Sequence, residues 1–143
     1  MSVSWEAPEG EHPARRAAQR SMNAVAAGLK DEWLALFAED AVVADPVGPS
    51  MLDPEGAGHR GRAGISSFWD RNFGAVKGFR FLVRDSFANG PSCANVTAIE
   101  MDLGAASMTV DCVVVYTVND SGLITSLMGY WEPDRAMATL TTR

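Results

Sequence analysis

The spacing of apolar residues changes from mainly helical to period two close to Gly74, and this change limits the possible folds more than any other feature. Before Gly74, apolar residues recur three and four positions apart, as Met22, Val25 and Leu29 do, which is typical of amphipathic helices. After Gly74 they follow period two, in runs separated by turn-forming residues, which indicates antiparallel strands. A chain with helices first and strands last is expected to be α+β, with helices on one face of a curved sheet.

Local signals place the expected elements. The expected helices, each with an apolar stripe or a helix-start signal, cover residues 13–29, 31–37, 62–73 and 133–140. The expected strands cover residues 41–45, 79–84, 93–101, 108–118 and 123–131. The intervening residues 46–61 hold three prolines and four glycines with almost no periodicity. Such a long irregular segment is either a plain connection or a loop that covers a binding site.

The strand expected over residues 108–118 is apolar on both faces. Because successive side chains alternate between the faces of a strand, one face carries Cys112, Val114 and Tyr116. The other face carries Val113 and Val115. Since a strand with one wet face would be polar there, we expect this strand to be covered twice. The helices are expected on one side, and a second copy of the chain, in a homodimer, on the other.

Length and charge restrict the class of protein and its partners. The 143 residues are enough for one domain, expected over residues 13–143 after a flexible arm over residues 1–12. The net charge of −6 disfavours nucleic acid and anionic membranes as partners. No apolar run approaches the roughly 20 residues of a spanning helix, and the polar start lacks the apolar centre of a signal peptide.

The cysteines and histidines do not indicate a metal site. The chain has only Cys93, Cys112, His12 and His59, a set that does not fit zinc coordination. Two buried, reduced thiols in a cytoplasmic protein are the expected state. We expect neither a metal nor a cofactor.

The strand over residues 41–45 ends in Asp45, and Pro46 follows at once. Pro46 has no backbone donor and favours an extended conformation in the residue before it, so the strand stops with a carboxylate at its end. In an apolar pocket, loss of solvation would raise the pKa of Asp45 and make it a stronger base near neutral pH. The alternative is that Asp45 and Pro46 only open a turn.

Three segments in this order resemble the ketosteroid isomerases of the nuclear transport factor 2-like, or SnoaL-like, superfamily. They are residues 37–48, which end in Asp45-Pro46-Val47-Gly48, residues 59–69 and residues 120–131. The resemblance implies a cone-shaped, curved antiparallel or mixed sheet around three helices from the N-terminal half, with a hydrophobic cavity between them. It also implies a homodimer through the convex face of the sheet.

The resemblance also implies roles for single residues. In the ketosteroid isomerases an aspartate at the position of Asp45 moves a proton between two steroid carbons, while a tyrosine and a protonated aspartic acid hydrogen-bond the dienolate oxygen. In this chain the tyrosine position holds Ser21 and the acid position holds Val114. Trp69 stands where a supporting tyrosine is common, and Trp131 matches a tryptophan of the pocket.

Other side chains are candidates to replace the missing donors. Tyr116, on the same face as Val114, is preferred because its hydroxyl is the most acidic; Trp69 and Ser21 are the others. A core tyrosine bonded to a backbone group is the alternative role for Tyr116. Asp111 has the opposite strand parity to Val114 and should face away from the pocket. Besides Asp45 and Tyr116, the residues expected at the substrate are Ser21, Trp33, Phe37, Trp69, Cys112, Val114 and Trp131.

Three functions fit these residues. The first is a steroid delta-isomerase-like enzyme that moves a proton next to the ketone of a steroid or similar polycyclic substrate, with Asp45 as general base. The second is a SnoaL-like cyclase or an epoxide-type hydrolase that uses the same cavity. The third is a non-catalytic binder of hydrophobic, steroid-like or polyketide-like molecules, which the replacement of both donors at Ser21 and Val114 favours. Fold alone does not choose among them.

Overall fold

One mixed, eight-stranded sheet forms the body of the protein in the computed structural model, which describes residues 2–142. The strands are β1 Ser2–Trp5, β2 Phe37–Ala44, β3 His59–Arg60, β4 Gly78–Asn89, β5 Ser92–Asp102, β6 Ala106–Val118, β7 Ile124–Tyr130 and β8 Thr141–Thr142. Their order is β1-β4-β5-β6-β7-β2-β3, and β8 pairs with β6. The strands from β4 to β7 are antiparallel, whereas β1 runs parallel to β4 and β2 parallel to β7.

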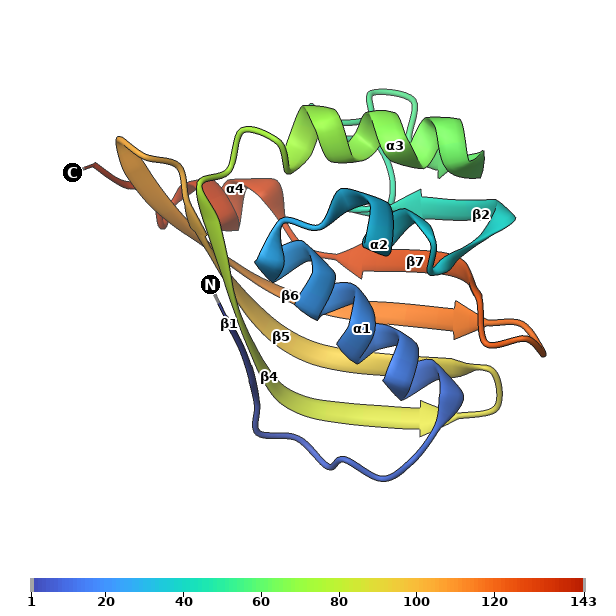
Figure 1. Cartoon of the computed structure of the whole chain (residues 1–143). Helices are drawn as coiled ribbons and strands as arrows, with labels where there is room; N and C mark the ends of the chain where they lie inside the picture. Colours follow the sequence, from blue (N-terminus) through green and yellow to red (C-terminus); the bar gives the residue numbers. More distant parts are fainter. Residues whose placement is uncertain (1, 143) are drawn as a thin grey trace.

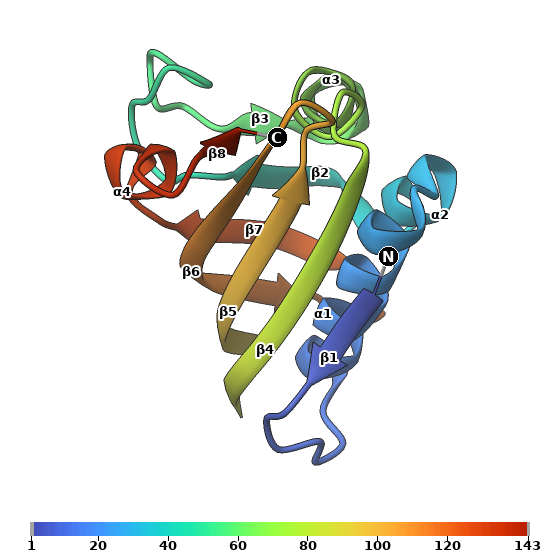
Figure 2. The same ribbon diagram turned by 90° about the vertical axis from the view of Figure 1, so that its left-hand side faces the viewer.

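Helices cover the concave side of this sheet. They are α1 Pro13–Ala27, α2 Lys30–Leu34 and α3 Gly61–Asn72. A fourth, short helix, α4 Pro133–Met137, follows β7 near the C-terminus and is not one of these covering helices. In Figure 1, α1, α2 and α3 lie on the same side of the strands. Figure 2 shows the sheet curving from β4 round to β2 and β3 without closing. The fold is therefore α+β with a curved, cone-like sheet, as the sequence predicted.

The ends of α1 follow simple capping chemistry. The helix begins after His12, whose Nδ1 accepts a hydrogen bond from Ala14 N–H at 3.0 Å. It ends at Gly28, whose φ of 71° lies in the left-handed region that glycine adopts without strain. The next helix, α2, starts two residues later, so the turn at Gly28 sets the angle at which α2 returns toward the sheet.

The boundary between α2 and β2 differs from the sequence-based expectation. The pattern predicted a helix over residues 31–37 and a strand from residue 41, whereas α2 ends at Leu34 and β2 begins at Phe37. Leu36 O accepts a hydrogen bond from Ile124 N–H, and Phe37 pairs with Ile124 in the parallel ladder. Pairing with a distant strand thus overrides the helical spacing of this short segment.

Residues 2–5 also differ from the flexible arm expected over residues 1–12. They form β1 beside β4, and Val3 and Trp5 pack against the core. Glu6 N–H continues this attachment by donating to Val83 O. The expectation was wrong for these residues because two alternating apolar side chains were enough to dock a short strand on an open sheet edge.

The two faces of β6 have different surroundings. Its concave-side residues are all buried, and they are Val110, Cys112, Val114, Tyr116 and Val118. On the convex side Val113 is 37% exposed and stands in register with Val96 of β5 and Tyr130 of β7. The convex face therefore presents a row of partly exposed apolar side chains across three strands.

A group of buried polar side chains joins α1 to β4 and β5, and we call it the Arg15 cluster: Arg15, Ser86, Cys93 and Asn95. Arg15 donates from Nε to Ser86 Oγ at 3.1 Å, from Nη2 to Ser86 O at 3.2 Å and from Nη1 to Gly10 O at 2.6 Å. Ser86 Oγ donates in turn to Asn95 Oδ1 at 2.9 Å and lies 3.2 Å from Cys93 Sγ. The polar groups of the cluster find partners within it or on neighbouring backbone oxygens, and the cluster ties the start of α1 to the sheet.

Candidate active site

A cavity of about 290 Å³ lies between the helices and the concave face of the sheet. Most of its wall is apolar, with contributions such as Val25 from α1, Phe81 from β4 and Leu127 from β7. The cavity is close to the lower end of the range of small-molecule sites, about 300–1,000 Å³. An apolar wall with a few polar side chains is the usual composition of such sites, and this one includes Ser21, Asp45 and Tyr116.

Asp45 lines the cavity directly after the last residue of β2. Its Oδ1 accepts a hydrogen bond of 2.6 Å from Trp131 Nε1–H. No residue in the range 2–142 donates to Oδ2, and no side-chain oxygen or nitrogen in that range is both fully buried and unpartnered. Oδ2 therefore keeps accessible surface at the cavity, where it can accept a proton.

The surroundings of Asp45 alter its acidity. Burial raises the pKa of Asp45 above its ordinary value, and the hydrogen bond from Trp131 partly opposes this rise by stabilising the charged carboxylate. Burial is the larger of the two effects. A general base is most effective when its pKa approaches the working pH, so this environment makes Asp45 a better base than a surface aspartate.

Gly129 on β7 makes room for the Asp45 carboxylate. A Cβ atom at position 129 would overlap Oδ1 of Asp45 and would lie 2.8 Å from its Cγ. The backbone closes around the same point, because Val47 N–H donates to Gly129 O at 2.8 Å. The parallel register that sets Ala44 opposite Met128 brings these two parts of the chain together. Any side chain at position 129 must therefore displace the acid.

Ser21, Trp33 and Tyr116 form a second polar group at the cavity, which we call the Ser21 triad. Trp33 Nε1–H donates to Ser21 Oγ at 3.0 Å, and Tyr116 O–H donates to the same oxygen at 2.9 Å. All three residues line the cavity, although Ser21 is only 1% exposed. Burial raises the pKa of Tyr116 far above its ordinary value; its bond to Ser21 lowers it less, and the charge of Asp45 raises it further. The hydroxyl of Tyr116 is therefore protonated at neutral pH.

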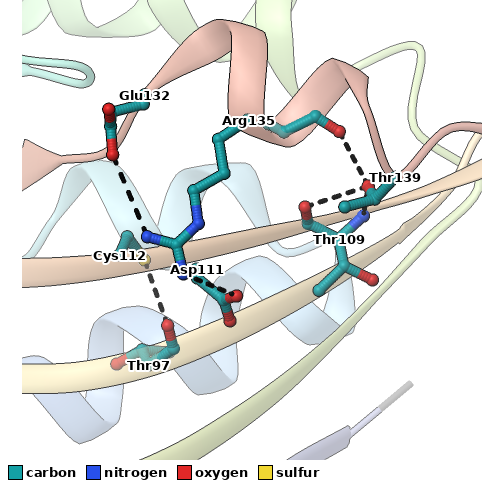
Figure 3. Close-up of polar contacts among 8 residues, drawn as sticks. Thr97, Thr109, Asp111, Cys112, Glu132, Arg135 and Thr139 are labelled. Atoms are coloured by element: carbon teal, nitrogen blue, oxygen red, sulfur yellow. Dashed lines mark hydrogen bonds and ion pairs between the residues drawn. The ribbon is translucent and has the colours of Figure 1, made fainter.

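The structure separates the sequence-predicted site residues into two sets. Those that line the cavity are Ser21, Trp33, Asp45, Val114, Tyr116 and Trp131. Phe37 and Trp69 do not line it; their rings pack 4.7 Å and 5.2 Å from that of Trp33, centroid to centroid, in the aromatic core behind the wall. Cys112 does not line it either, and its thiol donates to Thr97 O at 3.5 Å (Figure 3).

Asp111 and Cys112 lie outside the cavity, behind the part of its wall near Asp45. Asp111 faces outward, as its strand parity predicted, and its Oδ2 lies 3.5 Å from Nη2 of Arg135, which also approaches Glu132 (Figure 3). Asp111 therefore does not replace the acid missing at Val114. Burial raises the pKa of Cys112 to about 12, with smaller contributions from the charges of Asp45 and Asp111, so its thiol is protonated.

Part of the cavity was not identified from the sequence. Its further lining includes Leu52 from the loop after β2, Arg71 and Asn72 at the end of α3, and Leu103 and Met108 beside the turn between β5 and β6. Leu52 shows that the long loop reaches the site. Alternating apolar residues mark the inward face of a strand, but the pattern does not distinguish a cavity wall from a packed core.

No group of His, Cys, Asp or Glu side chains within residues 2–142 is arranged to hold a metal ion. No helix in the same range is long and apolar enough to cross a bilayer. His59, the histidine nearest the loop, packs its ring 4.9 Å from that of Phe68, centroid to centroid.

Several known proteins resemble this chain in sequence and fold. The family model described as SnoaL-like domain matches residues 18–127. A steroid Delta-isomerase of Nocardioides simplex is 30% identical over 125 residues, 87% of this chain and 94% of that enzyme. The Delta 5-3-ketosteroid isomerase from Mycobacterium sp. is 34% identical, with a TM-score of 0.81 over 93% of this chain and 100% of that one. RV0760c from Mycobacterium tuberculosis, solved with estradiol-17beta-hemisuccinate, is 31% identical, with a TM-score of 0.81 over 92% and 99% of the chains.

The curved sheet, the cavity on its concave side and the structural neighbours define the class as a nuclear transport factor 2-like α+β protein. Within that class the chain belongs to the SnoaL-like domain family, with a steroid isomerase among its relatives. The family resemblance predicted from the three sequence segments is therefore confirmed.

Proposed function

We propose that the protein is a steroid delta-isomerase-like enzyme, acting on a β,γ-unsaturated ketone of a steroid or a similar polycyclic molecule, with Asp45 as general base. The observation that carries this proposal is the state of the Asp45 carboxylate. One oxygen is held by Trp131, while the other accepts no bond from residues 2–142 and keeps accessible surface at an apolar cavity. The relatives that act on or bind steroids support the choice of substrate class.

In the proposed reaction, the Asp45 carboxylate takes a proton from the carbon between the ketone and the double bond. The C–H electron pair moves into a conjugated dienolate, and negative charge develops on the ketone oxygen. Asp45 then returns the same proton to the far carbon of the former double bond, which gives a conjugated enone. No oxidant or co-reactant is needed, and the Trp131 bond holds the carboxylate in place for both transfers.

The test is an absorbance assay with 5-androstene-3,17-dione, whose isomerisation produces a conjugated enone. We expect wild-type turnover and a loss of between about 10²-fold and 10⁴-fold in kcat for Asp45→Asn, the range of a general base. Asp40→Asn is the matched control, because Asp40 is an exposed aspartate on β2, the strand that Asp45 directly follows, and the substitution changes the charge equally. Equal rates for wild type and Asp45→Asn would remove Asp45 as the base.

A non-catalytic binder is the second candidate, and one observation favours it. Val114, at the position where the resemblance places a protonated acid, is aliphatic and lines the cavity. Tight, saturable steroid binding without any turnover would support this candidate. A hydrolase that needs a second carboxylate is less well supported, because Asp45 is the only carboxylate among the described residues that line the cavity.

A homodimer through the convex face of the sheet completes the proposal. The row formed by Val96, Val113 and Tyr130 is partly exposed, and Phe87 on β4 is 62% exposed. Burial of apolar side chains of this kind is a common driving force for subunit association. Light scattering after gel filtration should give twice the chain mass, and Val113→Lys should give the monomer mass. The proposed cytoplasmic location rests on Cys93 and Cys112, which are both free, buried thiols.

A further inference from the structure

The hydrogen bonds of the Ser21 triad indicate which group contacts the ligand oxygen. We propose that the Ser21 hydroxyl is the hydrogen-bond donor to that oxygen, and that Trp33 and Tyr116 act as positioning residues that hold Ser21 in this role. The inference rests on the proposed function in one respect: the oxygen concerned is the ketone oxygen that becomes an enolate. The Ser21 hydrogen stays on Ser21 throughout, so the only proton transferred is the one that Asp45 carries.

Counting hydrogens and lone pairs on Ser21 Oγ gives the first step. A serine hydroxyl has one hydrogen to donate and two lone pairs that accept. Trp33 Nε1–H and Tyr116 O–H both donate to this oxygen, at 3.0 Å and 2.9 Å. Both lone pairs are therefore in use, and the single hydrogen of Ser21 is the only hydrogen-bonding capacity that the oxygen retains.

The second step concerns where this hydrogen points. A serine inside a helix often donates to the carbonyl one turn earlier, which for Ser21 is that of Ala17. The structure contains no such bond, and within residues 2–142 Ser21 Oγ donates to no acceptor. Because Ser21 lines the cavity, a ligand oxygen in that cavity is the acceptor available to it.

The hydrogens and lone pairs counted above give another role to Tyr116, the donor preferred from the sequence. Its one hydrogen is already directed to Ser21 Oγ, so its oxygen can only accept from a ligand. Trp33 has only the one N–H, and that is directed to Ser21 as well. Trp33 and Tyr116 therefore donate to Ser21, and Ser21 in turn donates to the ligand.

The triad also suits the stabilisation of developing negative charge. Hydrogen bonds in series polarise one another, so the bonds from Tyr116 and Trp33 make the Ser21 hydroxyl a stronger donor. Fixed donors in a water-poor cavity stabilise an oxyanion more than the same groups in water. The Asp45 charge contributes to the raised pKa of Tyr116, which agrees with the base and the triad facing the same part of the cavity.

The experiment measures binding of 4-nitrophenolate, an aromatic oxyanion whose absorbance distinguishes its ionised and neutral forms. It uses Asp45→Asn as the background, which removes the competing carboxylate. In this background, Ser21→Ala should weaken 4-nitrophenolate binding by about tenfold to a hundredfold, as for other hydrogen bonds to charged groups. Tyr116→Phe should weaken it only a few-fold, because it removes the polarising bond and leaves the donor in place.

Two further variants keep this result interpretable. Ser86→Ala removes a buried serine hydroxyl in the Arg15 cluster, outside the cavity, and should leave 4-nitrophenolate binding unchanged. Ser21→Thr keeps the hydroxyl and should retain most of the binding. A loss for Tyr116→Phe that equals or exceeds that of Ser21→Ala would overturn the proposal, as would unchanged binding in a Ser21→Ala protein that circular dichroism shows to be folded.

The same measurements distinguish this inference from the proposed function. If Ser21→Ala weakens 4-nitrophenolate binding in the Asp45→Asn background, but the wild-type protein does not isomerise the ketosteroid, the proposed function alone is contradicted. Isomerisation that depends on Asp45 but continues unchanged in Ser21→Ala, with unchanged 4-nitrophenolate binding, would contradict the role of Ser21 alone.

Discussion

The protein contains two groups of polar side chains in its interior, the Arg15 cluster and the polar residues of the cavity, and they differ in how completely their hydrogen-bonding groups are paired. In the Arg15 cluster, Arg15, Ser86 and Asn95 bond to one another or to nearby backbone oxygens. At the cavity, Asp45 keeps one oxygen to which no residue in the range 2–142 donates, and Ser21 keeps one hydrogen for which the same residues offer no acceptor.

This difference separates a structural role from a functional one. Buried polar groups are normally paired, because an unmatched one costs about 1–3 kcal/mol. A cluster that pairs all of its groups adds specificity and leaves nothing for a ligand. Asp45 and Ser21 thus supply an acceptor and a donor beside an apolar wall, a pair that a ketone with an acidic neighbouring C–H can use. The four predictions below test this contrast, from the largest expected effect to the smallest.

The largest effect is expected from Gly129→Ala. The new Cβ would overlap the Asp45 carboxylate, so the acid must move, and misplacing a catalytic group by about 1 Å can cost about 10²-fold in rate. We expect kcat for the ketosteroid to fall by at least about 10²-fold. Gly10→Ala is the control at the Arg15 cluster, where a Cβ would lie at an ordinary 3.4 Å from Arg15. Wild-type turnover in Gly129→Ala would show that the fit of Asp45 against Gly129 is not required.

The pH dependence should change the rate by about tenfold per pH unit. Asp45 acts as a base only when ionised, and burial raises its pKa in the free protein, so kcat/KM should fall as pH decreases through a value above that of an ordinary aspartate. A pH profile of kcat/KM, collected where circular dichroism shows a folded protein, provides the measurement. Trp131→Phe removes the bond that favours the charged form, so the inflection should move to higher pH. An inflection at the ordinary aspartate value would contradict the effect of burial.

Within the Arg15 cluster, Ser86→Ala should reduce stability and spare the chemistry. It removes the partner of Arg15 Nε–H and of Asn95 Oδ1, and leaving buried groups unpaired should lower the free energy of unfolding by about 1–3 kcal/mol. Urea unfolding measures the loss, and kcat of the folded protein should stay at the wild-type value. A drop in kcat with unchanged stability would show that the cluster takes part in the site.

The smallest effect is a gain in stability for Asp45→Asn at neutral pH. Because the pKa of Asp45 is higher in the folded protein, ionisation above the unfolded-state pKa favours the unfolded chain. Wild type therefore loses stability as pH rises through the folded-state pKa, and Asn, which stays neutral, avoids that loss. Thermal unfolding should show a higher Tm for Asp45→Asn at pH 7 and a smaller difference at pH 4. A lower Tm at pH 7 would mean that the charged acid stabilises the fold.

The sequence predicted the order of elements and the general position of Asp45 because both depend on local patterns. Helical spacing before Gly74, alternation after it, and a proline that ends the strand at Asp45 are all visible within short windows. The family resemblance added the cone-like fold. The boundary at Phe37 was misjudged because pairing with Ile124, far along the chain, decides it.

The rest of the site depends on contacts between distant segments. Gly129 matters because the parallel register of β2 and β7 sets its Cα against Asp45. The role of Ser21 depends on two donors, one from α2 and one from β6, that meet at the same oxygen. Phe37 and Trp69 have the apolar character of cavity residues but pack behind the wall, a distinction that alternation and spacing do not carry.

The two cysteines give each of the compared regions its own chemical reporter. Cys93 belongs to the Arg15 cluster, and Cys112 lies behind the Asp45 side of the cavity; both thiols are buried and free. A buried thiol reacts with a disulfide reagent only when the structure around it opens, so each labelling rate measures a local opening equilibrium. In a Cys112→Ala variant the labelling rate reports on Cys93 alone, and in a Cys93→Ala variant it reports on Cys112 alone. A ligand in the cavity should then slow the labelling of Cys112 more than that of Cys93. The contrast between the two regions would then be measured as a difference in local opening.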